Sequence, residues 1–299
     1  MESGCLLCPR QCNIPRSGAP GYCGAGDTMV VSRAMLHPWE EPFISGQMGS
    51  GTIFFSGCSL RCVFCQNHSI SHRIQGREVT ADELVRIMHH LFLAGAHNIN
   101  LVTGAHFTDL IIPALVKARA MGVHIPFIWN SSGYESVATL KKLEGLIDVY
   151  LPDFKFMNPE YALRYAGAAD YPAKAKLALA EMYRQTGPSV FANGLIKSGM
   201  VVRHLVLPGL GEDSKDILDY LSSQYKDTIW ISLMNQYYPA DLPPGFAEID
   251  RTVTAAEYQD VTDYALFSGI RQALLQTADS QSAAYTPDFA LTGLEFLDK

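Results

Sequence analysis

Three closely spaced cysteines are the residues of this sequence with the clearest potential for chemistry. Cys58, Cys62 and Cys65 follow one another with the spacing C-x3-C-x2-C. Thiolates this close together can bind one small metal centre, and thiolate is the ligand that zinc and iron–sulfur clusters select. Three thiolates leave one iron of a four-iron cluster without a protein ligand. An open metal position is typical of a reactive site, because a substrate can bind there.

The elements around these cysteines place them at the end of a strand. The apolar run 53–55 predicts a short buried strand, and Ser56-Gly57 ends it. The alternatives to an iron–sulfur cluster are a structural zinc knuckle and three unrelated buried thiols. Disulfides are not expected, since no secretory signal precedes the cysteines and all seven lie within the first 65 residues.

Four further cysteines form a second candidate metal site near the N-terminus. Cys5, Cys8, Cys12 and Cys23 have the spacing C-x2-C-x3-C-x10-C in a segment rich in glycine and proline. Such a segment has little apolar core of its own, so a bound metal could order it. Four thiolates suit either structural Zn²⁺ or a second iron–sulfur cluster. The alternative is a reduced, cysteine-rich tail.

The composition limits the class of protein. The 299 residues are 48% hydrophobic and 18% charged, as in well-packed soluble proteins. A formal net charge of −7 argues against a general nucleic-acid-binding protein, which would carry a basic face. There is no run of about 20 apolar residues, so no membrane span is expected. The cysteine usage and the absence of a signal-like start predict a cytoplasmic protein.

Strands alternate with helices along most of the chain. Strands are predicted at about 51–56, 98–103, 123–128, 146–151, 200–207 and 228–234. Helices are predicted at about 81–95, 108–121, 135–144, 158–186 with a break near 171–172, 213–225 and 254–273. This alternation implies βα units and a parallel sheet, and six strands are too few for a closed eight-stranded barrel. A further strand at 29–31 could form a hairpin with the segment that follows it.

The strand ends collect polar residues, and in parallel α/β folds ligands bind at those ends. Lys155 and Arg203 are cations that could hold a carboxylate. Arg203 lies inside an apolar run, where an unpaired charge would be costly, so we expect it to serve the site. The other members of the set are Thr103, His106, Asn130, Ser132, Asp153 and Gln236.

Blander interpretations remain open for several of these residues. His106 could be an ordinary loop histidine, and Asp153 with Lys155 could be a surface pair. Phe64, between the second and third cysteines of the loop, could be a core residue. Glu40 and Glu41 either face the site or are solvated acids beside a turn proline.

The C-x3-C-x-aromatic-C pattern, with Phe64 at the aromatic position, resembles the signature of radical S-adenosylmethionine (SAM) enzymes. The resemblance implies a [4Fe-4S] cluster held by Cys58, Cys62 and Cys65, with the amino and carboxylate groups of SAM on the fourth iron. It implies one-electron cleavage of SAM to a 5′-deoxyadenosyl radical that abstracts hydrogen, with a reductant such as flavodoxin or ferredoxin. The implied fold is an α/β, partial (β/α)6 barrel, here with a cysteine-rich N-terminal extension.

Within that superfamily the chain is similar to pyruvate formate-lyase activating enzyme and to a branch of its homologues. Asp153-Phe154-Lys155 resembles the Asp-x-Lys of those enzymes, and residues 203–209 resemble their Arg-x-Val-x-x-Pro-Gly. By that similarity Lys155 and Arg203 hold the SAM carboxylate, and Asp153 lies beside SAM or binds a small cation.

The chain also departs from the pattern of those enzymes. Thr103-Gly104-Ala105-His106 stands where most radical SAM enzymes have a Gly-Gly-Glu stretch that receives the SAM amino group. Asn130 stands in place of an acid, within a segment that also holds Ser132, and Gln236-Tyr237 stands in place of a late histidine. These departures bear on the SAM contacts, with Thr103 and His106 as possible substitutes.

The resemblance implies an oxidoreductase of the pyruvate formate-lyase activating type, which abstracts hydrogen from a glycine of a glycyl-radical enzyme. One alternative is a radical SAM enzyme that acts on a small molecule or peptide. Another is a non-catalytic iron–sulfur protein for electron transfer or binding. We expect three parts: a cysteine-rich metal-binding extension at 1–48, the partial barrel at 49–240, and a C-terminal helix and tail packed on the barrel at 241–299.

Overall fold

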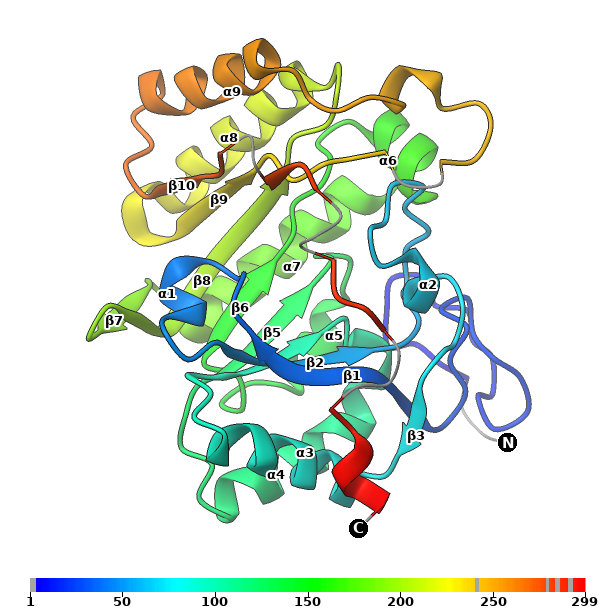
Figure 1. The fold of residues 1–299 in the computed structure, drawn as a ribbon. Helices are drawn as coiled ribbons and strands as arrows, with labels where there is room; N and C mark the ends of the chain where they lie inside the picture. The colour runs from blue at the N-terminus through cyan, green and yellow to red at the C-terminus, as the bar shows by residue number, and fades with distance from the viewer. Residues whose placement is uncertain (1–3, 240–241, 278–279, 283–285, 290–292, 299) are drawn as a thin grey trace.

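The computed structural model describes residues 4–239, 242–277, 280–282, 286–289 and 293–298. These residues form a ten-stranded, mostly parallel sheet with helices packed against it (Figure 1). The parallel strands are β2 (Ser50–Phe55), β4 (Ile99–Val102), β5 (Phe127–Ser131), β6 (Val149–Pro152), β8 (Leu195–Leu205), β9 (Trp230–Met234) and β10 (Ala273–Leu275). The expected α/β fold is confirmed.

The strand order places the carboxyl ends of the parallel strands along one edge. The order is β10-β9-β8-β6-β5-β4-β2-β1-β3, and consecutive parallel strands pair in register, for example Thr52 with Asn100 and Asn130 with Leu151. An isolated bridge between Asp153 and Arg203 continues the pairing of β6 with β8 beyond the end of β6. Loops that are far apart in the sequence therefore meet at this edge.

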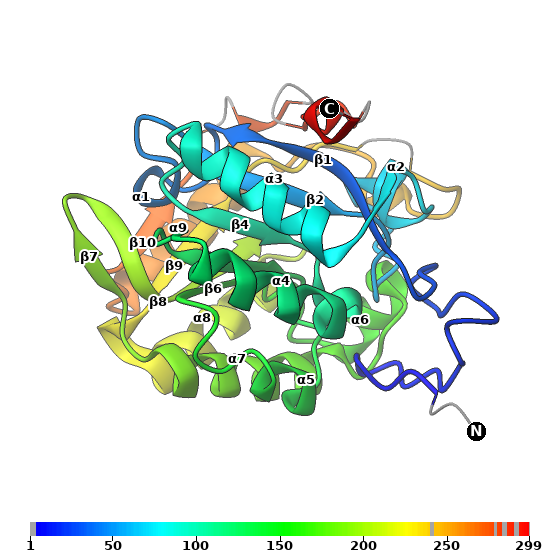
Figure 2. The ribbon, with the colours of Figure 1, turned by 90° about the horizontal axis from the view of Figure 1, so that it is seen from below.

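Helices connect the parallel strands and cover the sheet. They are α3 (Ala81–Leu93), α4 (Thr108–Ala120), α5 (Val137–Lys141), α6 (Pro159–Ala166), α7 (Tyr171–Thr186), α8 (Gly211–Tyr225) and α9 (Ala255–Phe267). Figure 2 shows α3, α4 and α7 in front of the strands. Thr80 and Thr254 both form the capping boxes that start α3 and α9. Shorter turns are α1 (Pro42–Ser45), α2 (His68–Ser71), η1 (Ala105–Phe107), η2 (Lys226–Thr228), η3 (Ala247–Ile249) and η6 (Glu295–Asp298).

Three antiparallel strands extend the sheet. β1 (Met29–His37) pairs with β2, as the predicted hairpin requires, and β3 (Arg77–Val79) pairs with β1. β7 (Val190–Ala192) pairs with β8. β1 belongs to the sheet, whereas residues 4–28 of the cysteine-rich segment before it contribute no strand to the sheet. The division at residue 48 stays a prediction.

Several predicted boundaries are wrong. The strand predicted at 200–207 is β8, at Leu195–Leu205, and the strand predicted at 146–151 is β6, at Val149–Pro152.

Two further differences have a clear physical reason. The helix predicted to reach residue 273 ends at Phe267, because Gly269 takes a positive φ of 79° that ends the last turn, and β10 follows. The strand predicted at 123–128 begins four residues later, at Phe127. Pro126 has no N–H to donate to a ladder, so the strand starts after it and continues into the polar Asn130 and Ser131.

The described parts of the C-terminal tail lie against the other end of the sheet. Phe289 packs on Phe54 of β2, with ring centroids 5.3 Å apart. Asp298 pairs with Arg77 of β3 at 2.5 Å. Figure 1 shows the last red piece of the tail, residues 295–298, beside α3. These contacts hold the described tail residues against β2 and β3, and the division of the chain at residue 241 stays a prediction.

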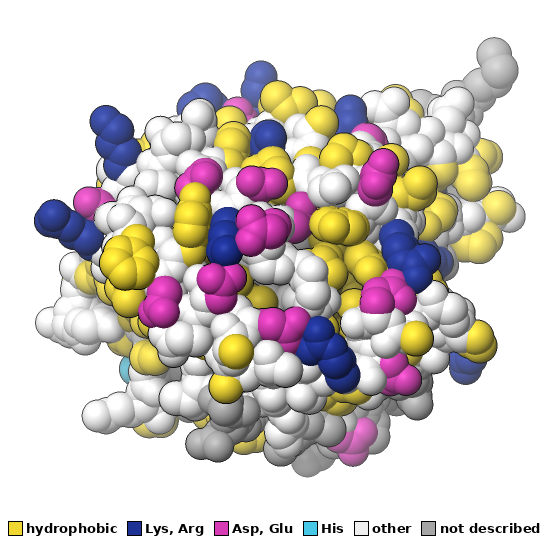
Figure 3. Space-filling model, turned by 90° about the horizontal axis from the view of Figure 1, so that it is seen from above, with side chains coloured by type: hydrophobic (Ala, Val, Ile, Leu, Met, Phe, Trp, Pro, Cys, Tyr) yellow, Lys and Arg dark blue, Asp and Glu magenta, His cyan; other side chains and the backbone are white. Residues whose placement is uncertain are grey.

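The described helices and one face of the surface bear on the expectations about membranes and nucleic acids. Of the helices in the described ranges, none combines the length and apolarity needed to cross a bilayer. Figure 3 shows acidic and basic side chains interspersed with hydrophobic ones on one face, with no continuous basic patch among the side chains coloured there. The expected absence of nucleic-acid binding stays a prediction.

A buried carboxyl group in the core gives a pH prediction. Glu135 accepts a hydrogen bond from Trp129 Nε1 at 2.9 Å, and burial raises its pKa from 4.5 to about 7. Between these pH values the folded protein holds a proton that the unfolded chain has lost, so the unfolding free energy falls as pH rises from 4.5 to 7. We expect this contribution to be about 3 kcal/mol and to disappear in Glu135→Gln, which keeps an acceptor for Trp129.

Urea unfolding at several pH values between 4.5 and 7 would measure the contribution of Glu135 to the unfolding free energy. The exposed Glu160→Gln variant serves as the control, and it should keep the pH dependence of the wild type. An identical pH dependence in the wild type and in Glu135→Gln would contradict the prediction.

Candidate functional site

The three loop cysteines open into one cavity at the carboxyl edge of the sheet. The cavity has a volume of about 180 Å³ and is lined by the strand ends as well as by the cysteine loop. Every predicted site residue except His106 and the four N-terminal cysteines lines it: Cys58, Cys62, Cys65, Phe64, Thr103, Asn130, Ser132, Asp153, Lys155, Arg203 and Gln236. The structure thus brings the predicted strand-end set together.

The cysteine thiols lie in a partly buried loop in which Cys62 is the buried member. The backbone N–H of Leu60 donates to Cys58 Sγ at 3.4 Å, and Cys65 Sγ lies 3.2 Å from Ser71 Oγ. Burial raises the pKa of the Cys58 thiol to about 11, and the charge of Cys65 adds to this, so a metal must displace a proton to bind there. Among the described residues, no three His, Cys, Asp or Glu side chains converge on a single-ion position. Soft ligands that share a cavity fit an iron–sulfur cluster.

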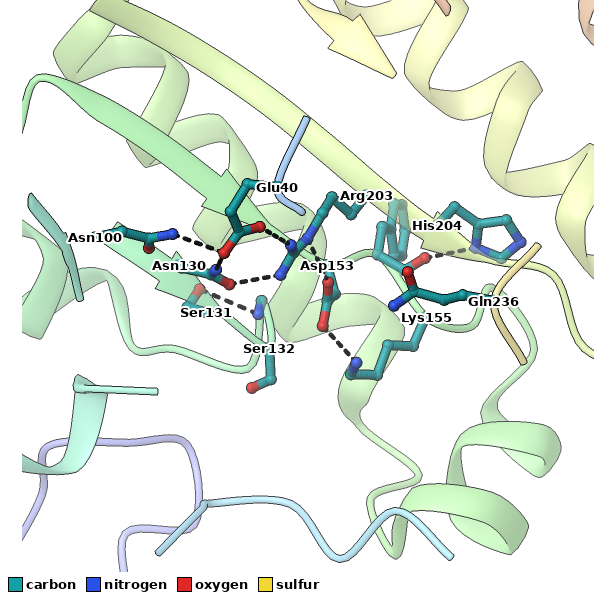
Figure 4. A network of polar contacts seen from close by, with 12 residues as sticks. Glu40, Asn100, Asn130, Ser131, Ser132, Asp153, Lys155, Arg203, His204 and Gln236 are labelled. Carbon is teal, nitrogen blue, oxygen red and sulfur yellow. Dashed lines mark hydrogen bonds and ion pairs between the residues drawn. The ribbon is translucent and has the colours of Figure 1, made fainter. Parts of the chain in front are cut away.

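A network of ion pairs contributes Asp153, Lys155 and Arg203 to the lining of this cavity (Figure 4). Arg203 donates to Asn130 Oδ1 at 2.6 Å and pairs with Glu40 Oε2 at 3.0 Å. Lys155 Nζ lies 2.5 Å from Asp153 Oδ2. Arg203 Nε and Asp153 Oδ1 are 3.4 Å apart, but neither atom makes a hydrogen bond to the described residues. One donor and one acceptor therefore remain for a ligand.

Burial and charge oppose each other in this network. Burial alone would raise the pKa of Asp153, but Lys155 and Arg203 hold it below its usual range. Burial alone would lower the pKa of Lys155, and Asp153 raises it above its ordinary value. All three groups are therefore charged at neutral pH. An ammonium group has three donors, so Lys155 keeps N–H groups beyond the one that faces Asp153.

Glu40 is the member of this network that the strand-end analysis missed. Its Oε1 accepts from Asn100 Nδ2 at 2.8 Å, and its Oε2 pairs with Arg203. It comes from the segment after β1, outside the βα repeats, so no strand-end pattern could select it. The only sequence signal was the Glu-Glu-Pro turn, for which both a site role and a solvated role had been open.

Of the two predicted residues that follow β4, Thr103 lines the cavity and His106 does not. His106 is 2% exposed and its Nε2 lies 2.7 Å from the Ser56 carbonyl oxygen, so the described geometry places it behind the cysteine loop rather than in the cavity. Burial lowers its pKa to about 4. Thr103 does line the cavity, with a φ of 58° that is rare for a β-branched residue. Such strain is typical of ligand sites.

The aromatic residue of the cysteine loop serves both the core and the cavity. Phe64 lines the cavity and packs edge-on against Phe156 and Tyr237, with centroids 6.0 and 6.4 Å away. The core interpretation and the site interpretation are therefore compatible. This packing fixes the chain between Cys62 and Cys65.

The four N-terminal cysteines lie near one another. A Cβ at Gly21 would be 3.3 Å from Cys12 Sγ and 3.6 Å from Cys23 Sγ, so both sulfur atoms face the same small space. Burial raises the pKa of Cys8 to about 11, and the charges of Cys23, Cys5 and Cys12 raise it further. The donor set suits a metal centre, but as at the loop cysteines the sulfur atoms do not converge on one ion.

The N-terminal segment docks directly on the cysteine loop. Arg10 Nε donates to the Ser59 carbonyl oxygen at 2.9 Å, and Arg61 Nη2 donates to the Tyr22 carbonyl oxygen at 2.7 Å. A Cβ at Gly57 would lie 2.6 Å from the Cys23 carbonyl oxygen, so only glycine allows this close approach. The two cysteine sets are thus held side by side.

Comparison with known proteins gives a consistent result. Residues 52–221 match the sequence model of the Radical SAM superfamily. An uncharacterized protein of Methanocaldococcus jannaschii is 28% identical over 270 residues, which cover 87% of this chain and 74% of that protein.

Solved structures share the fold. The crystal structure of Streptococcus suis SuiB matches 76% of this chain with a TM-score of 0.51 and 12% identity, and SuiB bound to S-adenosylmethionine matches 74% with a TM-score of 0.50 and 12% identity. In both cases the match covers 48% of the SuiB chain, so the present chain spans about half of their length.

Proposed function

Since the chain belongs to the Radical SAM superfamily, we propose that it is an oxidoreductase that binds a [4Fe-4S] cluster and SAM and abstracts hydrogen from a substrate. The observation that carries this proposal is that three cysteine thiols share one cavity with the paired cations of the strand ends. When bound, the cluster and SAM would supply a one-electron cleavage that yields the 5′-deoxyadenosyl radical.

We assign roles to the residues of the cavity on this basis. Cys58, Cys62 and Cys65 hold the cluster. The N–H groups of Lys155 and Arg203 that remain free bind the SAM carboxylate. Oxygen and nitrogen atoms at the strand ends then orient the rest of SAM, and the residues for this are Thr103, Asn130, Ser132 and Gln236. Asp153 keeps both cations in place.

Activation of a glycyl-radical enzyme is the finer proposal. It is supported by the Asp-x-Lys segment at 153–155 and the Arg-to-Pro-Gly segment at 203–209, which resemble pyruvate formate-lyase activating enzyme. A flavodoxin or ferredoxin would be the electron donor. A cytoplasmic location stays a prediction from the cysteine usage.

One observation favours the alternative, a smaller substrate. Thr286 and Pro287 of the C-terminal tail line a cavity of about 120 Å³ that Glu40, Arg203 and Gln236 also line. The tail therefore covers part of the mouth, whereas an activating enzyme must admit a protein loop. A small molecule or a short peptide would fit such a covered site better.

An anaerobic assay tests the proposed function. The reconstituted protein is reduced with dithionite and given SAM, and 5′-deoxyadenosine is measured with and without a glycyl-radical enzyme encoded in the same genome. A glycyl radical in the electron paramagnetic resonance (EPR) spectrum supports activation. 5′-Deoxyadenosine without that signal supports the smaller substrate. A cluster that binds SAM but never yields 5′-deoxyadenosine would leave the non-catalytic alternative.

A second metal centre at Cys5, Cys8, Cys12 and Cys23 is a separate proposal, with zinc and iron–sulfur both open. Replacing Cys8 by serine is expected to remove either one zinc or about four irons from the reconstituted protein. The loop cluster should remain, because its ligands are unchanged. Iron and zinc are counted on the same sample. The comparison variant is Cys62→Ser, which removes one ligand of the loop cluster and leaves the four N-terminal cysteines unchanged. An unchanged metal content in Cys8→Ser would refute a second centre.

A further inference from the structure

A second cavity adjoins the cysteine cavity behind Arg203 and Gln236. It has a volume of about 380 Å³, and Arg203, Met234 and Gln236 line both cavities. Its other walls come from the segment before α1, from β9 and from the region after β10. A group bound in it would be separated from the thiol cavity only by these shared side chains.

Glu41 contributes a buried carboxyl group to this cavity. It is 8% exposed, and although it stands at the N-cap of α1 its side chain makes no capping hydrogen bond within the described chain. Ser232 lines the same cavity, and burial raises the pKa of the Glu41 carboxyl group while Arg203 lowers it. Oε2 has no hydrogen-bond partner among the described residues. A buried carboxylate oxygen without a donor costs free energy, so this position suits a ligand that brings one.

The electrostatics of the walls indicate which donor fits. The neighbouring acid, Glu40, forms an ion pair with Arg203. The Oε2 atom of Glu41 accepts no hydrogen bond from a cation of the described chain. The amides of Gln236 and Gln276 are joined to each other at 3.1 Å, and Gln276 Oε1 accepts from the Asn235 N–H at 2.8 Å. These neutral groups add no charge, so the ionisable groups on the walls are Glu40, Glu41 and Arg203. Burial raises the pKa of Glu41, so a cation that binds beside it pairs with a carboxylate by displacing the proton of that group.

The shape of the acceptor narrows the ligand to an ammonium group. Of the Glu41 carboxyl oxygens, Oε2 is the buried one without a partner among the described residues, and a single acceptor atom disfavours the two-point pairing of a guanidinium. A primary ammonium needs one strong acceptor and leaves its other N–H groups for neutral oxygens. Trp39, which also lines the cavity, offers an aromatic face that attracts a cation.

We propose that this cavity is the substrate chamber and that Glu41 binds a primary ammonium group of the substrate. The group belongs either to a free amine or to the lysine side chain of a peptide, which present the same chemistry. The inference rests on the proposed function, because it places the substrate beside the SAM cavity. The binding of the ammonium group itself needs no SAM cleavage.

Calorimetric titration of the reconstituted full-length protein tests the binding. The probe is n-butylammonium, with n-butanol as the uncharged analogue. We expect saturable binding of butylammonium, binding at least tenfold weaker in Glu41→Gln, and no saturable binding of butanol. Glu212→Gln is the matched control, since that carboxylate is 88% exposed, and it should bind like the wild type. A blocked lysine tripeptide that binds more tightly than butylammonium identifies the peptide source, and weaker binding identifies the free amine.

Two results would overturn the inference. One is the absence of saturable butylammonium binding to the wild type, and the other is an unchanged affinity in Glu41→Gln. Urea unfolding guards against a folding defect, because replacing an unpartnered buried carboxyl by an amide should not lower the unfolding free energy. If Glu41→Gln is less stable than the wild type, Glu41→Asp provides a second test because it keeps the carboxyl group. Glu41→Asp should then bind butylammonium more tightly than Glu41→Gln does. Equal affinities of these two variants would also overturn the inference. Failure here with normal 5′-deoxyadenosine formation leaves the proposed function standing.

Discussion

Replacing Cys62 by alanine is expected to abolish the loop cluster and to reduce 5′-deoxyadenosine formation to background. Cys62 is buried in the cavity between Cys58 and Cys65, and two remaining thiols cannot hold a four-iron cluster that needs three. A loss of about a thousandfold or more would correspond to about 4 kcal/mol of lost transition-state stabilisation. Iron content, the EPR spectrum of the reduced protein and the 5′-deoxyadenosine yield measure the effect.

Ser59→Ala is the matched control for this variant. Ser59 lies in the same loop, but it is not one of the described residues that line the cavity. Its contact with Arg10 uses the backbone carbonyl oxygen, which the substitution leaves in place. It should retain the loop cluster and SAM cleavage. Substantial 5′-deoxyadenosine from Cys62→Ala, with Ser59→Ala behaving like the wild type, would refute the central proposal.

Replacing Arg203 by alanine is expected to reduce both stability and SAM affinity. The change leaves the buried carboxylates of Glu40 and Asp153 without their shared cation, so we expect the unfolding free energy to fall by about 3 kcal/mol. SAM affinity should fall at least tenfold, because a cation that faces the SAM carboxylate is lost. Iron content should stay close to that of the wild type, since no thiol is changed.

A double variant separates these two effects. Glu40→Gln with Arg203→Met removes both charges of one ion pair, so it should recover part of the stability lost in Arg203→Ala without recovering SAM affinity. Arg184→Ala removes an arginine that is 49% exposed, and it should change the unfolding free energy by no more than about 1 kcal/mol. Unchanged SAM affinity in Arg203→Ala would refute the carboxylate assignment.

Several features were accessible from the sequence because they are local. The apolar runs and capping boxes predicted α3, the start of α9 and a parallel sheet. Parallel strands end at one edge, so residues placed directly after apolar runs had to meet there. That is why Asp153, Lys155 and Arg203 could be assigned to one site before any contact was known.

The features that were missed depend on contacts between distant segments. β10 is three residues long, too short to give a periodic signal, and it exists because its backbone pairs with β9. His106 follows a strand end as the pattern requires, yet its ring turns toward the Ser56 carbonyl and away from the cavity. Spacing along the chain gives no information on such side-chain directions.

The sequence alone determined the type of chemistry, because the three-cysteine spacing and the strand-end residues are set by neighbours within a few positions. Tertiary structure decided how the site is completed. Glu40 reaches Arg203 across 163 positions of the chain, and Glu41 meets Ser232 on a strand that is even further away. The physical reason is that burial makes each charged group depend on a partner, and only the folded sheet determines which partner is within reach.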